Sequence, residues 1–357
     1  MSTHTAIATT SKGVVDAIQV ETERPPPGHV LVKVSYSAIG PLDTYMAVQG
    51  LFVQDYPTLL GFNVSGTVAE TGSGVEGLVV GDRVAGFGLQ SSNSKGMQQY
   101  TILPRTTCIK IPDSLSLEEA ATIPDNFITA FYTLFDCLGL PLPTFPVSAP
   151  PQRADTPILI YGAGATSGQY TIQLLALAGY NRIIATASPK HHEYLRSLGA
   201  HHTIDYRSPG LEEEILLAAG ESIDLAVDCI SAEETLAKIS KVMSANSSVA
   251  LLLPVKEGNS FSASEGRQLW MELPPDRNPF APTVKPIEVR TLLYETNEYM
   301  RDNLMLKILP FLLDEGIIKP NRVHLFDQGS LKERVEAALG FVHSGKVSGE
   351  KAIVKIL

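Results

Sequence analysis

The sequence predicts an α/β protein in which a small antiparallel β-barrel is combined with a doubly wound parallel sheet. Three observations support this prediction. Short β-branched runs broken by glycines fill the first third of the chain, strands alternate with helices between residues 157 and 254, and a proline-rich stretch at residues 138–156 separates the two patterns. Strands and helices that alternate at this spacing imply a parallel sheet covered by helices on both faces.

The first part of the chain reads as β structure. Residues 29–39 (HVLVKVSYSAI) alternate apolar and polar side chains, as a half-buried strand does. Short runs around residues 63–72 and 79–88 continue the barrel, and residues 111–123 predict a turn that leads into a helix. The segment GPLDTYMAVQG, residues 40–50, is bounded by glycines and is predicted to be a loop.

The second part alternates regularly. Six strands are predicted, at residues 157–162, 182–188, 202–206, 223–230, 247–254 and 286–294. Helices are predicted at residues 168–180, 191–199, 211–220 and 232–243. The C-terminal helices (303–316, 330–345) and strands (322–326, 351–357) should complete the first domain, which then comprises residues 1–125 and 300–357, with the parallel-sheet domain at 126–299.

Composition limits the function classes. The 357 residues are 44% hydrophobic and 18% charged, which excludes global disorder. A net charge of −10 argues against a nucleic-acid-binding surface. The three cysteines form no disulfide or zinc pattern, the N-terminus has no signal-peptide pattern, and no apolar run reaches about 18 residues. We therefore expect a cytoplasmic protein that does not span a membrane.

A glycine-rich turn is the clearest candidate binding site. YGAGATSGQ, residues 161–169, joins a buried strand to a helix, and Gly162, Gly164 and Gly168 let the backbone approach a pyrophosphate at the helix N-terminus. The spacing is G-x-G-x-x-x-G instead of the usual G-x-G-x-x-G. A tight turn that binds nothing is the alternative.

The end of the second parallel strand indicates which dinucleotide would bind. An acidic residue there would hold the ribose hydroxyls of NAD. This chain has ATASPKHH at residues 185–192, with Ser188 and Lys190 and no acid, and Tyr206 ends the next strand. A hydroxyl and an ammonium suit a ribose 2′-phosphate, so NADPH is the predicted cofactor. The alternative is a solvated loop that lacks an acid.

Metal and proton chemistry have few candidates. No set of three cysteine, histidine or acidic residues in the first domain suits a catalytic zinc, and the histidines at 191, 192, 201 and 202 are expected on the surface, so no metal is predicted. Tyr45 could donate a proton, with Asp43 two residues earlier. Thr129 lies where the two halves join. The alternatives are a packing aromatic for Tyr45 and a helix cap for Thr129.

Several of these motifs together resemble a known family. PLDTY (41–45), VGDRVAGF (80–87), ILIYGAGATSGQYTIQLL (158–175) and SGEKAIVKI (348–356) are similar to the medium-chain dehydrogenase/reductase superfamily. Within it, DTY and the absence of zinc ligands resemble the zinc-independent quinone oxidoreductase and enoyl reductase branch. LGLPLP, DCI and SGEK look most like the stand-alone, trans-acting enoyl reductases of fungal polyketide synthesis, the lovastatin type.

The resemblance implies a GroES-like catalytic domain, a Rossmann domain and NADPH in the cleft between them. The cofactor-binding residues that it implies are Leu42, Asp43, Thr44, Tyr45, Gly164, Ala165, Thr166, Ser167, Ser188, Pro189, Lys190, His191, Tyr206, Leu252, Leu253, Val347 and Ser348. The substrate-lining residues that it implies are Thr129, Ala130, Phe131, Tyr132, Thr133, Leu134, Phe135, Asp136, Leu292, Leu293, Tyr294, Glu295 and Thr296.

The resemblance also implies a reaction. Hydride would add to the β-carbon of an α,β-unsaturated thioester or ketone, Tyr45 or a water would return the proton, and Thr129 would orient the carbonyl. The substrate would be a small or carrier-bound enoyl compound, with a polyketide synthase as partner, and we expect a monomer. Gly40 and Asn63 depart from the family pattern, where an asparagine and an acidic residue are usual. A reductase of free quinones or alkenals, and an NADPH-binding auxiliary protein without turnover, are the alternatives.

Overall fold

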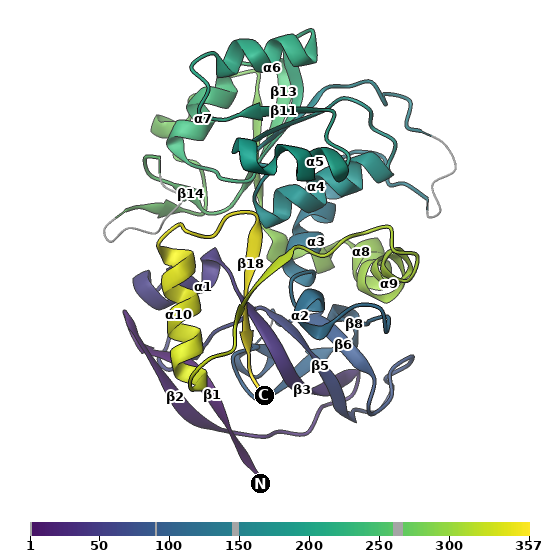
Figure 1. Cartoon of the computed structure of the whole chain (residues 1–357), viewed down its shortest axis with the longest axis vertical. Helices are drawn as coiled ribbons and strands as arrows, with labels where there is room; N and C mark the ends of the chain where they lie inside the picture. Colours follow the sequence, from purple (N-terminus) through teal and green to yellow (C-terminus); the bar gives the residue numbers. More distant parts are fainter. Residues whose placement is uncertain (1, 90, 145–149, 260–266) are drawn as a thin grey trace. The chain divides into compact units, whose positions relative to one another are not determined.

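The computed structural model describes residues 2–89, 91–144, 150–259 and 267–357 (Figure 1). The chain folds into two compact units. Unit 1 contains Met1–Asp125 and Glu298–Leu357, and unit 2 contains Asn126–Phe261 and Gly266–Asn297. Both ends of the chain therefore contribute to unit 1.

Unit 1 is mainly antiparallel β structure. One sheet has the order β2-β1-β4, and a second has the order β17-β18-β3-β5-β6-β8 with β7 also paired to β3. Only β17 and β18 in the second sheet run parallel. Its strands are β1 (Thr3–Ser11), β2 (Val14–Glu21), β3 (His29–Ile39), β4 (Thr58–Leu59), β5 (Asn63–Thr71), β6 (Arg83–Phe87), β7 (Tyr100–Pro104), β8 (Cys108–Lys110), β17 (Arg322–Phe326) and β18 (Glu350–Lys355).

The helices of unit 1 surround these sheets. They are α1 (Pro41–Gln49), η1 (Ser92–Ser94), η2 (Arg105–Thr107), α2 (Leu117–Ala120), α8 (Glu298–Asn303), η7 (Leu304–Ile308), α9 (Leu309–Asp314) and α10 (Leu331–His343). α10 packs its apolar face, including Val335 and Leu339, into the same core as Val32 and Val64 of the sheet. The predicted helix at 303–316 is three pieces, because a π-helical turn, η7, separates α8 from α9.

Unit 2 is a six-stranded parallel sheet with the order β11-β10-β9-β12-β13-β16. In chain order this is 3-2-1-4-5-6, the doubly wound arrangement that binds dinucleotides at the carboxyl ends of its strands. The sheet strands are β9 (Ile158–Tyr161), β10 (Ile183–Ala187), β11 (His202–Asp205), β12 (Ile223–Asp228), β13 (Met243–Leu252) and β16 (Lys285–Val289), and a separate hairpin pairs β14 (Val255–Lys256) with β15 (Leu269–Trp270). The predicted fold class is confirmed.

The helices of unit 2 follow the strands in alternation. They are η3 (Thr133–Cys137), α4 (Thr166–Leu177), η4 (Pro189–His191), α5 (His192–Ser197), α6 (Leu211–Ala219), α7 (Glu233–Ser240), η5 (Pro275–Arg277) and η6 (Thr291–Thr296), and α3 (Pro124–Tyr132) begins in unit 1 and continues into unit 2. The prediction of a strand over 286–294 was wrong in its second half, because the chain leaves the sheet after Val289 and forms η6.

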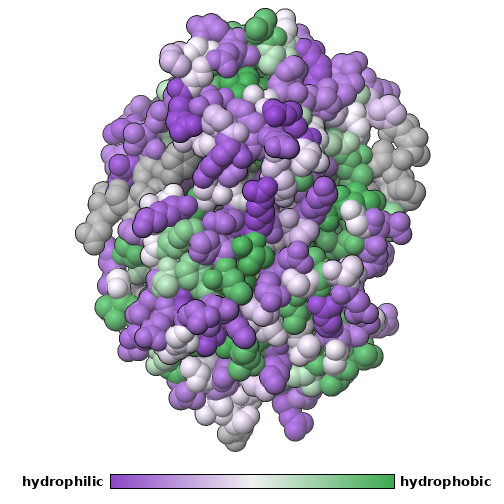
Figure 2. All heavy atoms as spheres, viewed as in Figure 1, coloured by the Kyte–Doolittle hydropathy of each residue, from purple (hydrophilic) through white to green (hydrophobic). Residues whose placement is uncertain are grey.

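Figure 2 shows one face on which hydrophilic side chains predominate and apolar side chains lie in small groups between them. In the part of the chain that the structure describes, no helix is both long and apolar enough to cross a bilayer.

Candidate functional site

The glycine-rich turn lies between β9 and α4, as predicted. Gly162 has φ +72°, a conformation that favours glycine, and a Cβ on Gly168 would lie 2.8 Å from the Ala163 Cα. The first hydrogen bond of α4 joins the Gln169 N–H to the Ala165 carbonyl, so the N–H groups before Gln169 have no partner within the helix ladder. The N–H groups of Gly162 and Ala163 donate to Thr186, and that of Ala165 donates to the Gly162 carbonyl, which fixes the turn. The close backbone and the helix N-terminus fit the pyrophosphate of a dinucleotide.

The end of β10 carries the predicted 2′-phosphate residues. Ser188 precedes η4, Lys190 is exposed, and β10 pairs with β11 so that Ala187 lies opposite Asp205. Tyr206 follows directly, with the Arg207 guanidinium 5.4 Å from the centre of its ring. Unit 2 therefore brings Ser188 and Lys190 near Tyr206 at one edge of the sheet.

His191 corrects one expectation. It was predicted to be a surface histidine, but it is only 7% exposed. Its ring covers the glycine turn, since a Cβ on Gly164 would lie 3.3 Å from the His191 Cδ2. The η4 turn causes this, because it folds the chain back over the end of the sheet and the Ser188 carbonyl accepts the His191 N–H. The His191 ring thus packs against the glycine turn at Gly164.

The remaining predicted cofactor residues of unit 2 end the fifth strand. Leu252 is the last residue of β13 and Leu253 follows it, both half-buried. In unit 1, Val347 and Ser348 lie in the connection between α10 and β18, and Val347 packs against the core of that unit.

The two predicted substrate segments contact each other within unit 2. The Thr129 and Thr291 hydroxyls are 3.0 Å apart, and the Asn297 amide donates to the Asp136 carboxylate at 2.6 Å. After Thr129 the helix α3 continues into the π-helical turn η3, which contains Asp136. Turns of this kind are frequent at functional sites. The structure therefore joins α3 and η3 to η6 as one wall.

Most side chains of that wall face the core. The rings of Phe127, Phe131 and Phe135 pack one after another at helical spacing, and Ala130 through Phe135 are buried. Tyr294 is also buried, whereas Leu292 and Leu293 are 44% and 46% exposed. Thr129 is the sixth residue of α3 and not a helix cap, so its hydroxyl serves the contact with Thr291.

The segment with Tyr45 is a helix, not the predicted loop. Pro41 occupies the first turn of α1, the Asp43 carboxylate accepts the N–H of the N-cap residue Gly40, and Gly50 ends the helix with φ +76°. The bounding glycines are therefore the two caps. Tyr45 is 2% exposed, and burial raises the pKa of its phenol, so the phenol stays protonated.

Asp43 fixes the start of α1. Its Oδ2 accepts the Gly40 N–H at 2.8 Å and its Oδ1 accepts the Gly61 N–H at 2.7 Å. Burial raises the pKa of Asp43 to about 6, while these two hydrogen bonds and the nearby lysines oppose the shift. Both carboxylate oxygens are thus bonded to the backbone of unit 1.

Two buried lysines near Asp43 were missed by sequence reasoning. Lys95 donates to the Gly88 carbonyl at 2.8 Å and lies 4.0 Å from the centre of the Phe62 ring, and burial lowers its pKa to about 8. Lys351 pairs with Asp125 at 2.8 Å. Both lysines are nearly inaccessible to solvent. Lys95 lies in a run of polar residues and gives no sequence signal of burial.

The two departures from the family pattern lie beside this cluster. Asn63 accepts the Asp125 N–H at 2.8 Å through its amide oxygen. A Cβ on Gly40 would lie 3.7 Å from the Lys351 Nζ and 3.8 Å from the Asp43 Oδ2, which is ordinary contact. Gly40 and Asn63 are therefore accommodated by the polar network of unit 1.

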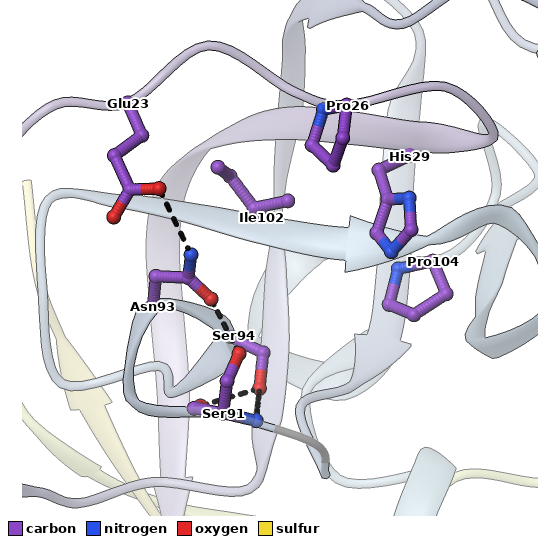
Figure 3. A pocket seen from close by; sticks show the side chains of 8 residues that line it. All are labelled: Glu23, Pro26, His29, Ser91, Asn93, Ser94, Ile102 and Pro104. Carbon is purple, nitrogen blue, oxygen red and sulfur yellow. Dashed lines mark hydrogen bonds between the residues drawn. The ribbon is translucent and has the colours of Figure 1, made fainter.

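A separate small pocket in unit 1 contains none of the predicted residues. Figure 3 shows its lining, in which the Asn93 amide donates to Glu23 at 3.3 Å and the Ser91 hydroxyl donates to Asn93. Its volume is about 190 Å³. Among the described residues, no three histidine, cysteine or acidic side chains are grouped as a metal site would require.

Comparisons with known proteins bear on the family. The family model for the alcohol dehydrogenase GroES-like domain matches residues 26–113, and the model for the zinc-binding dehydrogenase matches residues 168–265. These matches fall on the barrel strands and on the parallel sheet. The chain belongs to the medium-chain dehydrogenase/reductase superfamily. Its members use a nicotinamide cofactor, which agrees with the glycine turn of unit 2.

Relatives within the superfamily include fungal enoyl reductases. The trans-enoyl reductase himH of Aspergillus japonicus is 34% identical over 60% of this chain and 62% of that protein. The enoyl reductase component lovC of the lovastatin nonaketide synthase of Aspergillus terreus is 36% identical over 59% of this chain and 58% of that protein. The matches thus span somewhat more than half the length of these relatives. The resemblance to trans-enoyl reductases is confirmed at this level.

Solved structures share the whole fold. The CurK enoyl reductase has a TM-score of 0.73 at 21% identity, and a quinone oxidoreductase of Pseudomonas syringae has a TM-score of 0.74 at 21% identity. Each comparison covers 99% of both chains. At this identity the likeness shows the superfamily fold alone.

Proposed function

We propose that this chain is an NADPH-dependent enoyl reductase that reduces an α,β-unsaturated polyketide-type thioester or ketone. The supporting observation lies at the carboxyl ends of the unit 2 strands. There the glycine turn after β9 lies next to the end of β10, and the segment that follows β10 carries Lys190 where an acid would bind NAD. The relatives named trans-enoyl reductases support the substrate class. In this proposal the enzyme acts in trans, as the name trans-enoyl reductase describes for its relatives, and its partner is a polyketide synthase.

The residues of unit 2 account for cofactor binding in this proposal. NADPH, when bound, supplies the hydride that reduces the β-carbon. Gly164, Ala165, Thr166 and Ser167 hold the pyrophosphate at the start of α4, and Ser188, Lys190 and Tyr206 hold the 2′-phosphate, where a carboxylate would repel it. Leu252 and Leu253 border the rest of the dinucleotide.

Tyr45 and Thr129 are the proposed catalytic residues. The Tyr45 phenol is protonated at neutral pH, so it can donate a hydrogen bond and, directly or through a water, a proton to the α-carbon. The Thr129 hydroxyl is held by Thr291 and can orient the substrate carbonyl. Hydrogen bonds of this kind stabilise the negative charge that develops on an enolate oxygen.

A substrate panel tests the proposal. Enoyl thioesters, free and attached to an acyl-carrier protein, are incubated with enzyme and NADPH, and the loss of NADPH absorbance is followed. We expect turnover of enoyl thioesters that drops about 10²-fold or more in Tyr45→Phe, as is usual when an acid–base group is removed. Thr291→Ser, which keeps the hydroxyl contact with Thr129, serves as the matched control.

Two outcomes would contradict the proposal. Reduction of small quinones or alkenals without any activity on thioesters would indicate a stand-alone quinone or alkenal reductase. Tight NADPH binding without reduction of any acceptor, carrier-bound forms included, would indicate an auxiliary protein.

A further inference from the structure

A buried acid and a half-buried lysine in unit 2 are not used by the proposed chemistry. Asp228 ends β12 and its side chain has no accessible surface. Its Oδ1 accepts the Ile230 N–H at 2.9 Å, and its Oδ2 accepts the Thr235 hydroxyl from α7. The Ser231 hydroxyl donates to the Asp228 carbonyl at 3.0 Å. Asp228 thus holds the turn that follows β12 from its N-terminal side.

Lys256 holds the same turn from its other side. It lies on β14, and its ammonium donates to the Ile230 carbonyl and, at 3.4 Å, to the Pro254 carbonyl. Its own N–H donates to the Ser231 carbonyl at 2.8 Å. Both backbone polar groups of Ile230 are therefore bonded to charged side chains, one buried and one half-buried. Ser231 is kept at φ +53°, a conformation that non-glycine residues rarely adopt.

The turn that these two side chains hold contacts the glycine turn. A Cβ on Gly162 would lie 2.4 Å from the Ile230 Cγ1 and 2.6 Å from its Cδ1, so the Ile230 side chain fills the space beside Gly162. Next to it, the Cys229 N–H donates to the Tyr161 carbonyl at 3.0 Å, and the Cys229 Cβ lies 3.8 Å from a Cβ built on Gly162. The 229–231 turn is thus packed against the start of the segment that would carry the pyrophosphate.

Burial of the Asp228 carboxylate needs a reason. A buried charge loses its hydration, so it is often no more stabilising than an apolar side chain of the same size. Asp228 and Lys256 form directional hydrogen bonds with the N–H and the carbonyl of Ile230, which apolar side chains could not form. The side chain of the same residue packs against Gly162.

We propose that Asp228 and Lys256 are positioning residues for the dinucleotide, which hold Ile230 against Gly162 and so fix the backbone of the glycine turn. This inference rests on the proposed function, because it requires NADPH to bind at that turn. Neither side chain needs to touch the cofactor, and the effect passes through Ile230.

The test is a set of NADPH titrations followed by fluorescence of the bound cofactor, at a temperature well below the unfolding midpoint of every variant. We expect Asp228→Ala to weaken NADPH binding about tenfold, since one lost buried hydrogen bond corresponds to about that change. Asp228→Asn, which keeps the acceptor for the Ile230 N–H, should stay within about threefold of the natural chain. Asp224→Asn, at the opposite end of β12, is the matched control and should bind normally.

A double variant separates positioning from general destabilisation. If Asp228 acts through Ile230, then Asp228→Ala combined with Ile230→Ala binds NADPH no more weakly than Ile230→Ala alone. If Asp228→Ala does not fold, Lys256→Met and Lys256→Met with Ile230→Ala provide the same comparison. Steady-state kinetics should show a raised KM for NADPH with kcat largely retained.

The outcomes are distinguishable from failure of the proposed function. If the natural chain does not bind NADPH, the proposed function fails and this inference fails with it. If the natural chain binds NADPH and the Asp228 and Lys256 variants bind equally well, or if their losses add to that of Ile230→Ala, the inference alone is overturned.

Discussion

Lys190 is the residue on which the choice of cofactor depends. It is exposed in η4, two residues after Ser188, and β10 pairs with β11, which Tyr206 follows. We predict that Lys190→Ala lowers kcat/KM for NADPH about tenfold, the effect of losing one charge-assisted contact at the surface, and leaves NADH use unchanged. Lys241→Ala, which removes an exposed lysine at the end of α7, should change neither value. Equal losses with both cofactors would show that Lys190 does not contact the 2′-phosphate.

Gly168 is required by the close approach of α4 to the chain that enters it. A methyl group there would lie 2.8 Å from the Ala163 Cα and 2.9 Å from its carbonyl oxygen, which are backbone atoms. We predict that Gly168→Ala lowers the free energy of unfolding in urea by about 1–3 kcal/mol through overpacking. Gly340→Ala on α10, where no atom lies within 4 Å, should instead raise it by about 0.5–1 kcal/mol. A stable Gly168→Ala variant would contradict the close packing.

At the scale of the element, α1 depends on one carboxylate. Asp43 accepts N–H groups from Gly40, in its own cap, and from Gly61, which is distant in sequence. We predict that Asp43→Ala lowers the free energy of unfolding by about 3 kcal/mol or more, because two buried N–H groups lose their acceptor. Asp16→Ala, which breaks an exposed ion pair with Lys332, should cost less than about 1 kcal/mol in the same urea titrations.

The accuracy of the sequence-based prediction also differs between elements. The first four strands of the unit 2 sheet were predicted within a few residues, because continuous apolar runs such as Ile158–Tyr161 have one stable environment, the centre of a covered sheet. The sixth was predicted too long, since the chain leaves the sheet after Val289. α1 was mistaken for a loop because its glycines and proline are helix caps as well as turn residues, and because the partner of Asp43 at Gly61 cannot be seen locally.

The site shows the same limit. The glycine turn is local and was predicted, whereas the contact of Lys256 with Ile230 depends on β12 and β14 meeting in space. The bond from the Ile230 N–H to Asp228 spans two residues, but its support of Gly162 depends on β12 lying beside β9. The catalytic and binding roles assigned to Tyr45, Thr129 and the cofactor residues stay predictions until the variants are measured.

For the whole molecule, pH should change stability through its buried lysines. The pKa of Lys95 is lowered from 10.5 to about 8 by burial. Below pH 8 the amine is protonated in both states, and between about 8 and 10.5 it is protonated mainly in the unfolded chain. The unfolded state then binds more protons, so stability rises with pH across this window, by up to about 1.4 kcal/mol per pH unit.

Lys95→Met should remove this contribution. Urea titrations at several pH values are expected to show that the natural chain gains stability relative to the variant as the pH rises from 8 to 10.5. Lys241→Met, which replaces an exposed lysine, should follow the natural chain in parallel. A constant difference between Lys95→Met and the natural chain would mean that Lys95 keeps its ordinary pKa.

The position of β18 has a consequence for biosynthesis. This strand pairs with β3 on one side and β17 on the other, and its Ile353 and Val354 are completely buried. During translation all six strands of the parallel sheet are synthesised before β18. β3 therefore lacks this neighbour until about three hundred further codons have been translated. The nascent barrel therefore exposes an unpaired hydrophobic edge until the final strand emerges, which makes it the part of the chain that chaperones would need to shield.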